Sequence, residues 1–301
     1  MSVSRVHLLF LCATTVLSVA PGAKAQELVV TNRAGVHLQV DQENTEPSLK
    51  ILLPGQPASD PGIEVLFPEH VTARPHGAEA QHLYLFRPGR QEQRPLWRLN
   101  GMSLEYQMPL AGILLTARAT LEEDGVRYNY EFSSSSGPAY DLIQAVTDPR
   151  MATELLRDIR LERTYVHHAN GFDLLASETP ARLTMPLREW LPNRFRVPFS
   201  WPVDTSRVEK QPDGITWYNK SRPVDEPFIA TISTDGKWIM ATFARDPGNV
   251  WTNPELTCQH ADPQTSLPRA SRAAQESKSL LFQGTLADAL KKVRSQRARM
   301  K

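Results

Sequence analysis

The sequence predicts an all-β protein, an antiparallel β-sandwich with a few short helices and a helix at its C-terminus. Three observations lead to this fold class. Apolar and polar residues alternate at every second position through much of the chain, which is the period of a strand with one buried face. The alternating runs are short and are joined by Asp-Gly pairs or by connections rich in Pro and Gly, as in sandwiches and barrels. Signals for helices are few.

The best-specified pair of strands lies at residues 113–132. The first strand places Ile113, Leu115, Ala117, Ala119 and Leu121 on its apolar face, and the return strand places Val126, Tyr128, Tyr130 and Phe132 there. Between the strands stands Asp124-Gly125, a pair preferred in tight hairpin turns. A second hairpin is predicted at residues 228–243 around Asp235-Gly236.

Shorter strands and three helical segments complete the prediction. The strands are expected at residues 27–31, 36–40, 63–67, 83–86, 103–107, 172–176, 216–218 and 279–282. Asp148-Pro149 predicts the start of a short helix that ends near Arg157, because proline is tolerated in the first turn of a helix. One helical turn is expected at residues 187–191. Leu286, Leu290 and Val293 follow one another at helical spacing and predict the C-terminal helix.

The first 25 residues are interpreted as a cleavable secretory signal. Arg5 supplies the positive charge, residues 6–19 the apolar stretch, and Ala23 and Ala25 the small residues of a cleavage site. Gln26 would then begin a single β-sandwich domain, residues 26–301, that is periplasmic or secreted. The alternative is a membrane anchor, but the apolar stretch is shorter than the roughly 20 residues that cross a bilayer. No later stretch is apolar enough, so no transmembrane segment is expected after cleavage.

Charge and cysteine content narrow the classes of function. The formal net charge is +1, and the basic residues are concentrated in the last eleven positions. The rest of the mature chain is therefore acidic, which does not support binding to nucleic acid. The basic tail is expected to be a solvated helix, with contact to anionic lipid or a polyanion as the alternative. Cys12 leaves with the signal, so Cys258 is left without a disulfide partner and is either buried, reactive or a metal ligand.

One cluster of residues suited to chemistry lies at residues 161–168. On a strand, Arg163, Tyr165 and His167 share a face, and His168 follows them. Arginine binds carboxylates with two hydrogen bonds, and tyrosine offers a ring and a hydroxyl. Such a surface suits a polyhydroxylated or carboxylated ligand. The alternative is an ordinary polar face exposed to solvent.

A second cluster follows the second hairpin, in a segment expected to be a long loop. It contains Trp251, Asn253, Cys258, His260 and Asp262. In an extended segment the last three side chains point the same way, and all three are potential metal ligands. A structural zinc site requires four ligands, however, and this spacing is not a recognised one. We therefore predict no metal site, with Cys258 in apolar packing and His260 on the surface.

The sharpest hypothesis from the sequence is that the two clusters form one site. Trp251 would stack on a sugar ring, Arg163 would hold an anionic group, and His167 or His260 would transfer a proton as the catalytic residue. Tyr165, His168, Asn253 and Asp262 would complete the ligand contacts. The alternative is that Trp251 belongs to the core and the histidines are exposed.

The stretch from Trp97 to Arg150 resembles the galactose mutarotase-like, or supersandwich, group of carbohydrate-active proteins. The likeness lies in the long hairpin at residues 113–132, which ends in Phe132-Ser133-Ser134-Ser135, and in the segment Ala145-Val146-Thr147-Asp148-Pro149 after it. The resemblance implies a long antiparallel sandwich and a carbohydrate ligand. Mutarotases of this group carry a catalytic His-Pro after the hairpin. Here the comparable place reads Asp148-Pro149, so the resemblance implies no catalytic residue.

The function predicted on these grounds is that of an exported carbohydrate-binding or carbohydrate-processing protein. Two alternatives remain open: a non-enzymatic interaction module of the cell envelope, and a metal-dependent enzyme. The sequence contains no glycine-rich phosphate loop, no H-E-x-x-H and no G-x-S-x-G motif. It names no cofactor, and it does not decide whether the protein is an enzyme.

Overall fold

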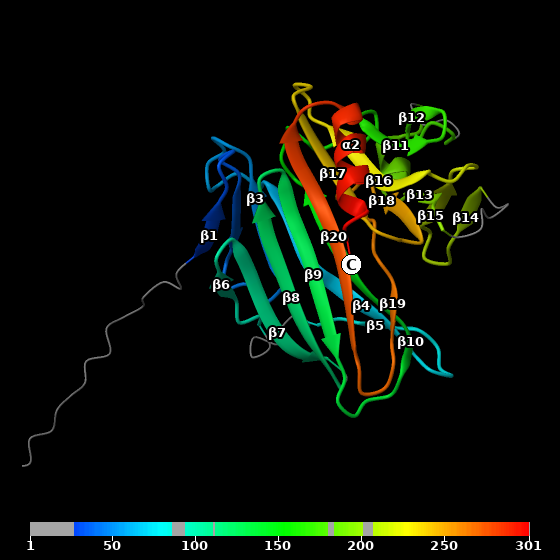
Figure 1. Ribbon diagram of the computed structural model, residues 1–301. Coiled ribbons are helices and arrows are strands. Elements are labelled where there is room, and N and C mark those ends of the chain that lie inside the picture. The colour runs from blue at the N-terminus through cyan, green and yellow to red at the C-terminus, as the bar shows by residue number, and fades with distance from the viewer. Residues whose placement is uncertain (1–26, 86–93, 111, 180–183, 201–206, 301) are drawn as a thin grey trace, which may run out of the picture.

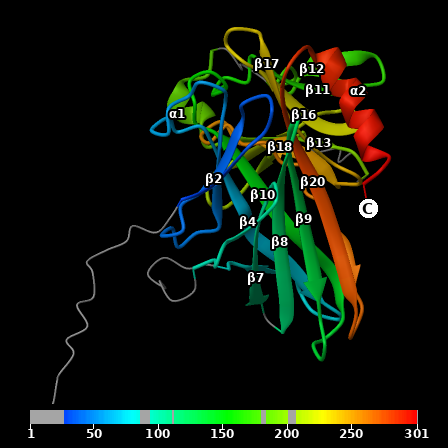
Figure 2. The same ribbon diagram turned by 60° about the vertical axis from the view of Figure 1, so that its left-hand side comes forward.

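A computed structural model describes residues 27–85, 94–110, 112–179, 184–200 and 207–300 of the chain. Most of these residues lie in strands, and the strands form three sheets (Figures 1 and 2). The predicted antiparallel β-sandwich is confirmed. The proposed signal, including Cys12, lies outside the described residues. Neither helix in the described part of the chain is long and apolar enough to cross a membrane.

The largest sheet has nine strands and contains both predicted hairpins. In spatial order it consists of β12 (Gly171–Leu174), β11 (Thr164–His168), β16 (Glu226–Ile232), β17 (Trp238–Ala244), β20 (Arg272–Gln283), β9 (Gly125–Ser133), β8 (Ile113–Glu122), β7 (Ser103–Leu110) and β6 (Arg98–Asn100). All neighbouring pairs are antiparallel.

The turn of the first hairpin lies one residue earlier than predicted. Glu122 pairs with Gly125, so the two-residue loop consists of Glu123 and Asp124, and Gly125 is the first residue of β9. The apolar faces are nevertheless those predicted from the alternation, because the register pairs Leu121 with Val126.

The second sheet has seven strands and faces the β7–β9 half of the first. It contains β1 (Leu28–Thr31), β2 (His37–Val40), β3 (Ser48–Leu52), β4 (Ile63–Pro75), β10 (Tyr140–Met151), β19 (Thr265–Leu267) and β5 (Gln81–Leu83), the last paired with β4. The main core fills the space between the two sheets. Phe67, Tyr106, Tyr128 and Tyr130 meet there as a cluster of packed rings.

The third sheet is small and lies beside the β11–β16 end of the first (Figure 1). Its order is β14 (Val208–Lys210), β15 (Thr216–Asn219), β13 (Arg194–Pro198) and β18 (Asn249–Thr252). The pair β13 and β15 is parallel, a departure from the antiparallel prediction. A second core lies between this sheet and β11 and β16, and it includes Val166, Trp190 and Phe195.

Two of the three predicted helical segments are present. One turn is α1 (Leu187–Trp190), and the C-terminal helix is α2 (Leu286–Arg297). Thr285 caps α2 through a reciprocal pair of hydrogen bonds with Asp288. The apolar side of α2, with Ala289 and Val293, covers β16, β17 and β20 and forms a third core with Phe228 (Figure 1).

The prediction of a helix that starts at Asp148-Pro149 is wrong. Both residues lie inside β10, where Asp148 pairs with Leu66 and Pro149 with Val65 of β4. β10 is buried at every position from Ala145 to Pro149 and pairs with β4, and this tertiary context overrides the local signal of the Asp-Pro pair. The expectation of a structureless loop from Trp251 onward also fails in part. Trp251 belongs to β18 and pairs with His260, which lies across from it.

Candidate functional site

The second predicted cluster forms a compact buried centre around His260. Trp251 and His260 are cross-strand neighbours, and their rings stack with centroids 3.7 Å apart and planes 4° from parallel. His260 Nε2 lies 3.1 Å from Cys258 Sγ. The backbone N–H of Asn253 donates to the same sulfur at 3.5 Å. The predicted convergence of side chains at alternate positions is therefore confirmed for this segment.

Two carboxylates complete the centre. Asp148 Oδ1 lies 3.3 Å from His260 Nε2, and Asp262 Oδ2 lies 3.3 Å from His260 Nδ1. Arg150 Nε donates to the other oxygen of Asp148 at 2.6 Å. The side chains of Asp148, His260 and Asp262 are only 2%, 1% and 7% exposed. His260 is thus not on the surface, and Cys258 is buried among polar atoms rather than in apolar packing, so both predictions were wrong.

In this centre, interactions between the side chains shift the pKa values of His260 and Asp148 in the direction opposite to the effect of burial. Burial lowers the pKa of His260, but the electrostatic effect of Cys258 and hydrogen bonding to Asp148, Asp262 and Cys258 outweigh it and raise this pKa well above the ordinary value. Burial likewise raises the pKa of Asp148, but His260 and Arg150 outweigh it, so the pKa is lowered. The centre therefore favours charged forms in a place from which solvent is excluded.

The first predicted cluster lies on β11 and is built differently. His167 Nδ1 lies 2.6 Å from Asp225 Oδ1, and the imidazole packs edge-on against Phe172 with centroids 4.8 Å apart. The backbone carbonyl of Pro223 lies 2.8 Å from His168 Nδ1. Both imidazoles are buried, although the Asp225 carboxylate is 33% exposed.

Arg163 does not take part in this cluster as predicted. It precedes β11, and its guanidinium donates to the backbone carbonyls of Ile232 and Arg157, the latter at 2.6 Å. Its hydrogen bonds tie a turn to β16. Tyr165 is half-buried on the same face of β11 as His167.

The two predicted clusters make no direct contact with each other among the described residues. His167 contacts Phe172, which packs against the core under α2. Ala261, the neighbour of His260, belongs instead to the core beneath the third sheet. Among the contacts of the described residues, none joins His167 to His260 or to Trp251. The hypothesis of one shared site therefore stays a prediction, and each cluster is built from its own contacts.

An aromatic surface on the third sheet extends the His260 centre outward. Trp217 and Trp251 are each half-buried, and their rings lie 5.4 Å apart at 55°. The Arg196 guanidinium lies over the Trp217 ring, 5.0 Å from its centroid. Arg196 is fixed in turn by Glu209 and by the Asn219 carbonyl, each at 2.9 Å. We call Trp217, Trp251, Arg196, Glu209 and Asn219 the tryptophan surface.

Sequence reasoning found Trp251 but missed Trp217 and Arg196. The register explains why. Arg194 pairs with Trp217 in the parallel pair of β13 and β15, and Arg196 pairs with Trp251 across β18. A parallel pairing joins distant segments and leaves no local signal in the sequence. A surface hollow of about 580 Å³ lies elsewhere, near Gln39, Lys50 and Glu64, and no predicted site residue lines it.

Comparisons with known proteins bear on the fold. No protein-family model matches the sequence, and no curated protein matches it. The Slr1438 protein of Synechocystis is similar in structure, with a TM-score of 0.50 at 12% identity over 86% of this chain and 96% of that one. A galactose mutarotase related enzyme of Lactobacillus acidophilus matches with a TM-score of 0.43 at 10% identity over 86% of this chain and 98% of that one.

A galactose 1-epimerase of the same species matches with a TM-score of 0.46 at 11% identity, covering 86% of this chain and 95% of that one. Galactose mutarotase-related structures are thus among those that this chain matches, as the resemblance in the sequence predicts, and the Slr1438 match shows a likeness in fold. At such identities the likeness gives no residue of this chain a role.

Proposed function

We propose that this protein is an exported carbohydrate-binding or carbohydrate-processing protein and that the sugar contacts the tryptophan surface. The observation that carries the proposal is the pair of half-buried rings, Trp217 and Trp251, beside fixed polar groups. Indole rings pack on the apolar faces of sugar rings, and a polar rim provides hydrogen bonds to hydroxyls.

The polar rim of the surface is already ordered. Arg196 is held over Trp217 by Glu209 and Asn219, so little side-chain entropy would be lost when a ligand binds. One ring face of Trp251 is covered by His260, so a ligand would contact the half-buried ring elsewhere, beside Trp217. An ordered arginine also favours sugars that carry a carboxylate.

Replacing Trp217 by alanine tests the site. We expect the variant to bind a glycan identified on an array at least about tenfold more weakly, because an interface tryptophan contributes about 2 kcal/mol or more. Isothermal titration with that glycan measures the change. Trp217 is preferred to Trp251, whose removal would also uncover His260.

Tyr84→Ala provides the control. Tyr84 is an exposed aromatic residue, at 58%, that lies near His70 and far from the third sheet in the chain. Its removal should leave affinity unchanged. If the Trp217→Ala variant binds the glycan as the wild type does, the proposed surface is wrong. If the array gives no ligand at all, the alternative of a non-enzymatic envelope module takes precedence.

The export part of the proposal rests on the sequence of the first 25 residues. Protein recovered from the periplasm or the medium should begin at or near Gln26, which intact-mass spectrometry measures directly. A full-length chain recovered in the membrane fraction would instead identify these residues as an anchor.

A further inference from the structure

We propose that Asp148, Cys258 and His260 bind a divalent transition-metal ion of the zinc class. The inference is independent of carbohydrate binding. The three ligand atoms, Asp148 Oδ1, Cys258 Sγ and His260 Nε2, lie within 4.8 Å of one another, and all three residues are buried. Carboxylate, thiolate and imidazole are the ligand types that zinc accepts.

The distances between the ligand atoms suit a metal. Zinc bonds of about 2.0–2.3 Å in a tetrahedron place neighbouring ligand atoms roughly 3.3–3.8 Å apart. In the structure Nε2 lies 3.1 Å from Sγ and 3.3 Å from Oδ1. A small outward adjustment of these side chains would admit the ion.

An unpartnered oxygen points to a missing ligand. Apart from the 3.3 Å ion-pair contact with His260 Nε2, Asp148 Oδ1 has no hydrogen-bond partner among the described residues, although the Asp148 side chain is only 2% exposed. A buried carboxylate oxygen without a partner costs free energy. Coordination of a cation between Oδ1, Sγ and Nε2 would remove that cost.

Each proposed ligand has an outer partner that orients it. Arg150 donates to Asp148 Oδ2, the Asn253 N–H donates to Cys258 Sγ, and the Asp262 carboxylate lies beside His260 Nδ1. Asp262 is itself fixed, because Oδ1 accepts from the Thr147 N–H at 3.0 Å. A carboxylate behind a ligating histidine and hydrogen bonds to a ligating sulfur are typical of metal sites in proteins.

The charges of the centre also favour a dication. Metal binding requires Cys258 as thiolate and His260 as neutral imidazole. In that bound form the two aspartates and the sulfur would be opposed by Arg150 alone, which leaves two negative charges in a buried place. Such a charge is strongly unfavourable without compensation. A divalent ion would balance it. The site would join β10 to the segment after β18 and lie directly behind Trp251.

The test uses the full chain with Cys12→Ser, so that Cys258 is the only thiol. The protein is produced with Zn²⁺ in the medium and purified without chelators, and its metal content is measured by plasma mass spectrometry. We expect about one zinc ion per chain, falling at least about tenfold in Cys258→Ser and in Asp148→Asn. Refolding with Co²⁺ should give a thiolate-to-cobalt charge-transfer absorption that Cys258→Ser lacks.

His167→Ala is the matched control, because it removes another buried histidine paired with an aspartate and should leave the metal content unchanged. A wild-type chain that holds no zinc, and that shows no charge-transfer band after refolding with Co²⁺, would overturn the proposal. Equal metal content in the wild type and in Cys258→Ser would overturn it as well. If Cys258→Ser does not fold, the cobalt spectrum of the parent chain decides, since its only possible thiolate is Cys258.

Discussion

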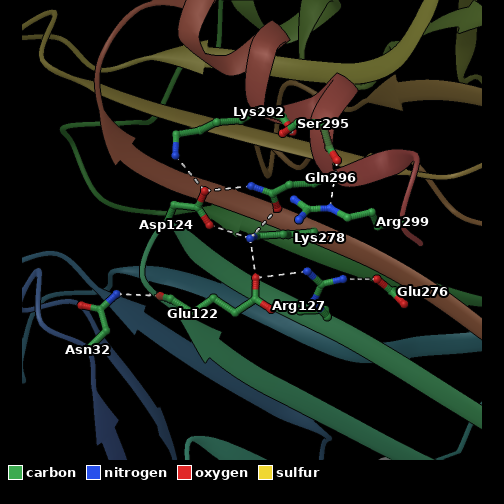
Figure 3. Close-up of polar contacts among 10 residues, drawn as sticks. All are labelled: Asn32, Glu122, Asp124, Arg127, Glu276, Lys278, Lys292, Ser295, Gln296 and Arg299. Carbon is green, nitrogen blue, oxygen red and sulfur yellow. Dashed lines mark hydrogen bonds and ion pairs between the residues drawn. The ribbon is translucent and has the colours of Figure 1, made fainter. Parts of the chain in front are cut away.

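Replacing Lys278 by methionine is expected to lower the free energy of unfolding by about 3 kcal/mol. Lys278 lies in β20 with only 1% of its side chain exposed. Its ammonium group donates to Glu122 at 2.5 Å, to Asp124 at 2.6 Å and to the Gln296 carbonyl of α2 at 2.7 Å (Figure 3). Methionine fits the stem of the lysine but leaves the partly buried Glu122 and Asp124 without their shared cation. Urea denaturation measures the loss.

The expected loss lies at the lower end of the range for buried ion pairs because the carboxylates keep other partners. Arg127 still contacts Glu122 at 2.7 Å, and Lys292 still contacts Asp124 at 2.9 Å (Figure 3). Lys292→Met is the matched control. This lysine reaches the same Asp124, but it is 36% exposed, so its removal should cost less than about 1 kcal/mol. Equal losses in the two variants would contradict the assignment of Lys278 as the central cation.

The same network sets a pH dependence that the Lys278→Met variant should alter. Burial raises the pKa of Asp124, but hydrogen bonds from Lys278 and Lys292 outweigh it and lower the pKa to about 2. A depressed carboxyl pKa contributes stability above the unfolded pKa of about 3.9, and this contribution is lost as the pH falls towards 2. Between about pH 4 and pH 2 the wild type should therefore lose more stability than the variant.

Gly125→Ala is expected to lower the free energy of unfolding by at least about 3 kcal/mol or to prevent folding. Gly125 begins β9 with φ +145°, and a Cβ atom there would lie 2.0 Å from the Ser279 carbonyl oxygen and 2.9 Å from the Leu280 Cα. Both are backbone atoms of the adjacent β20, so the clash is relieved only by moving a strand. Expression yield and thermal unfolding measure the effect.

The second Asp-Gly pair provides the control. Gly236 has φ +72°, and a Cβ atom there would meet nothing within 4 Å. Gly236→Ala should therefore cost only the strain of a left-handed alanine, about 1–2 kcal/mol. Similar losses at the two positions would mean that backbone strain, and not the close approach of β20, limits the residue type at position 125.

The two hairpins of the large sheet could be predicted from the sequence because their signals are local. The alternation in β8 and β9 follows directly from which side chains face the core, and it survives even though the turn is displaced by one residue. The Asp148-Pro149 pair shows the limit of such signals. Its capping preference is local, whereas its inclusion in β10 depends on pairing with β4, some eighty residues earlier in the chain.

Part of the candidate site could also be predicted, because that part depends on local spacing in the sequence. The convergence of Cys258, His260 and Asp262 follows from their spacing on an extended segment. The arrival of Asp148 opposite His260 does not, because β10 and this segment meet only through tertiary structure.

The Lys278 network also constrains the order in which the molecule can fold. Asp124 and Glu122 lie in the first long hairpin, but their cation comes 154–156 residues later, and Gln296 of α2 comes 172 residues after Asp124. Contacts at such separations form late and slow the folding of a domain. A chain that has emerged only as far as β9 therefore contains Arg127 to pair with Glu122, but it does not yet contain Lys278, Lys292 or Gln296, the partners of Asp124. The Asp124 carboxylate gains its cationic partners only when β20 and α2 dock on the hairpin. We therefore expect docking of the C-terminal segment to be a late step of folding.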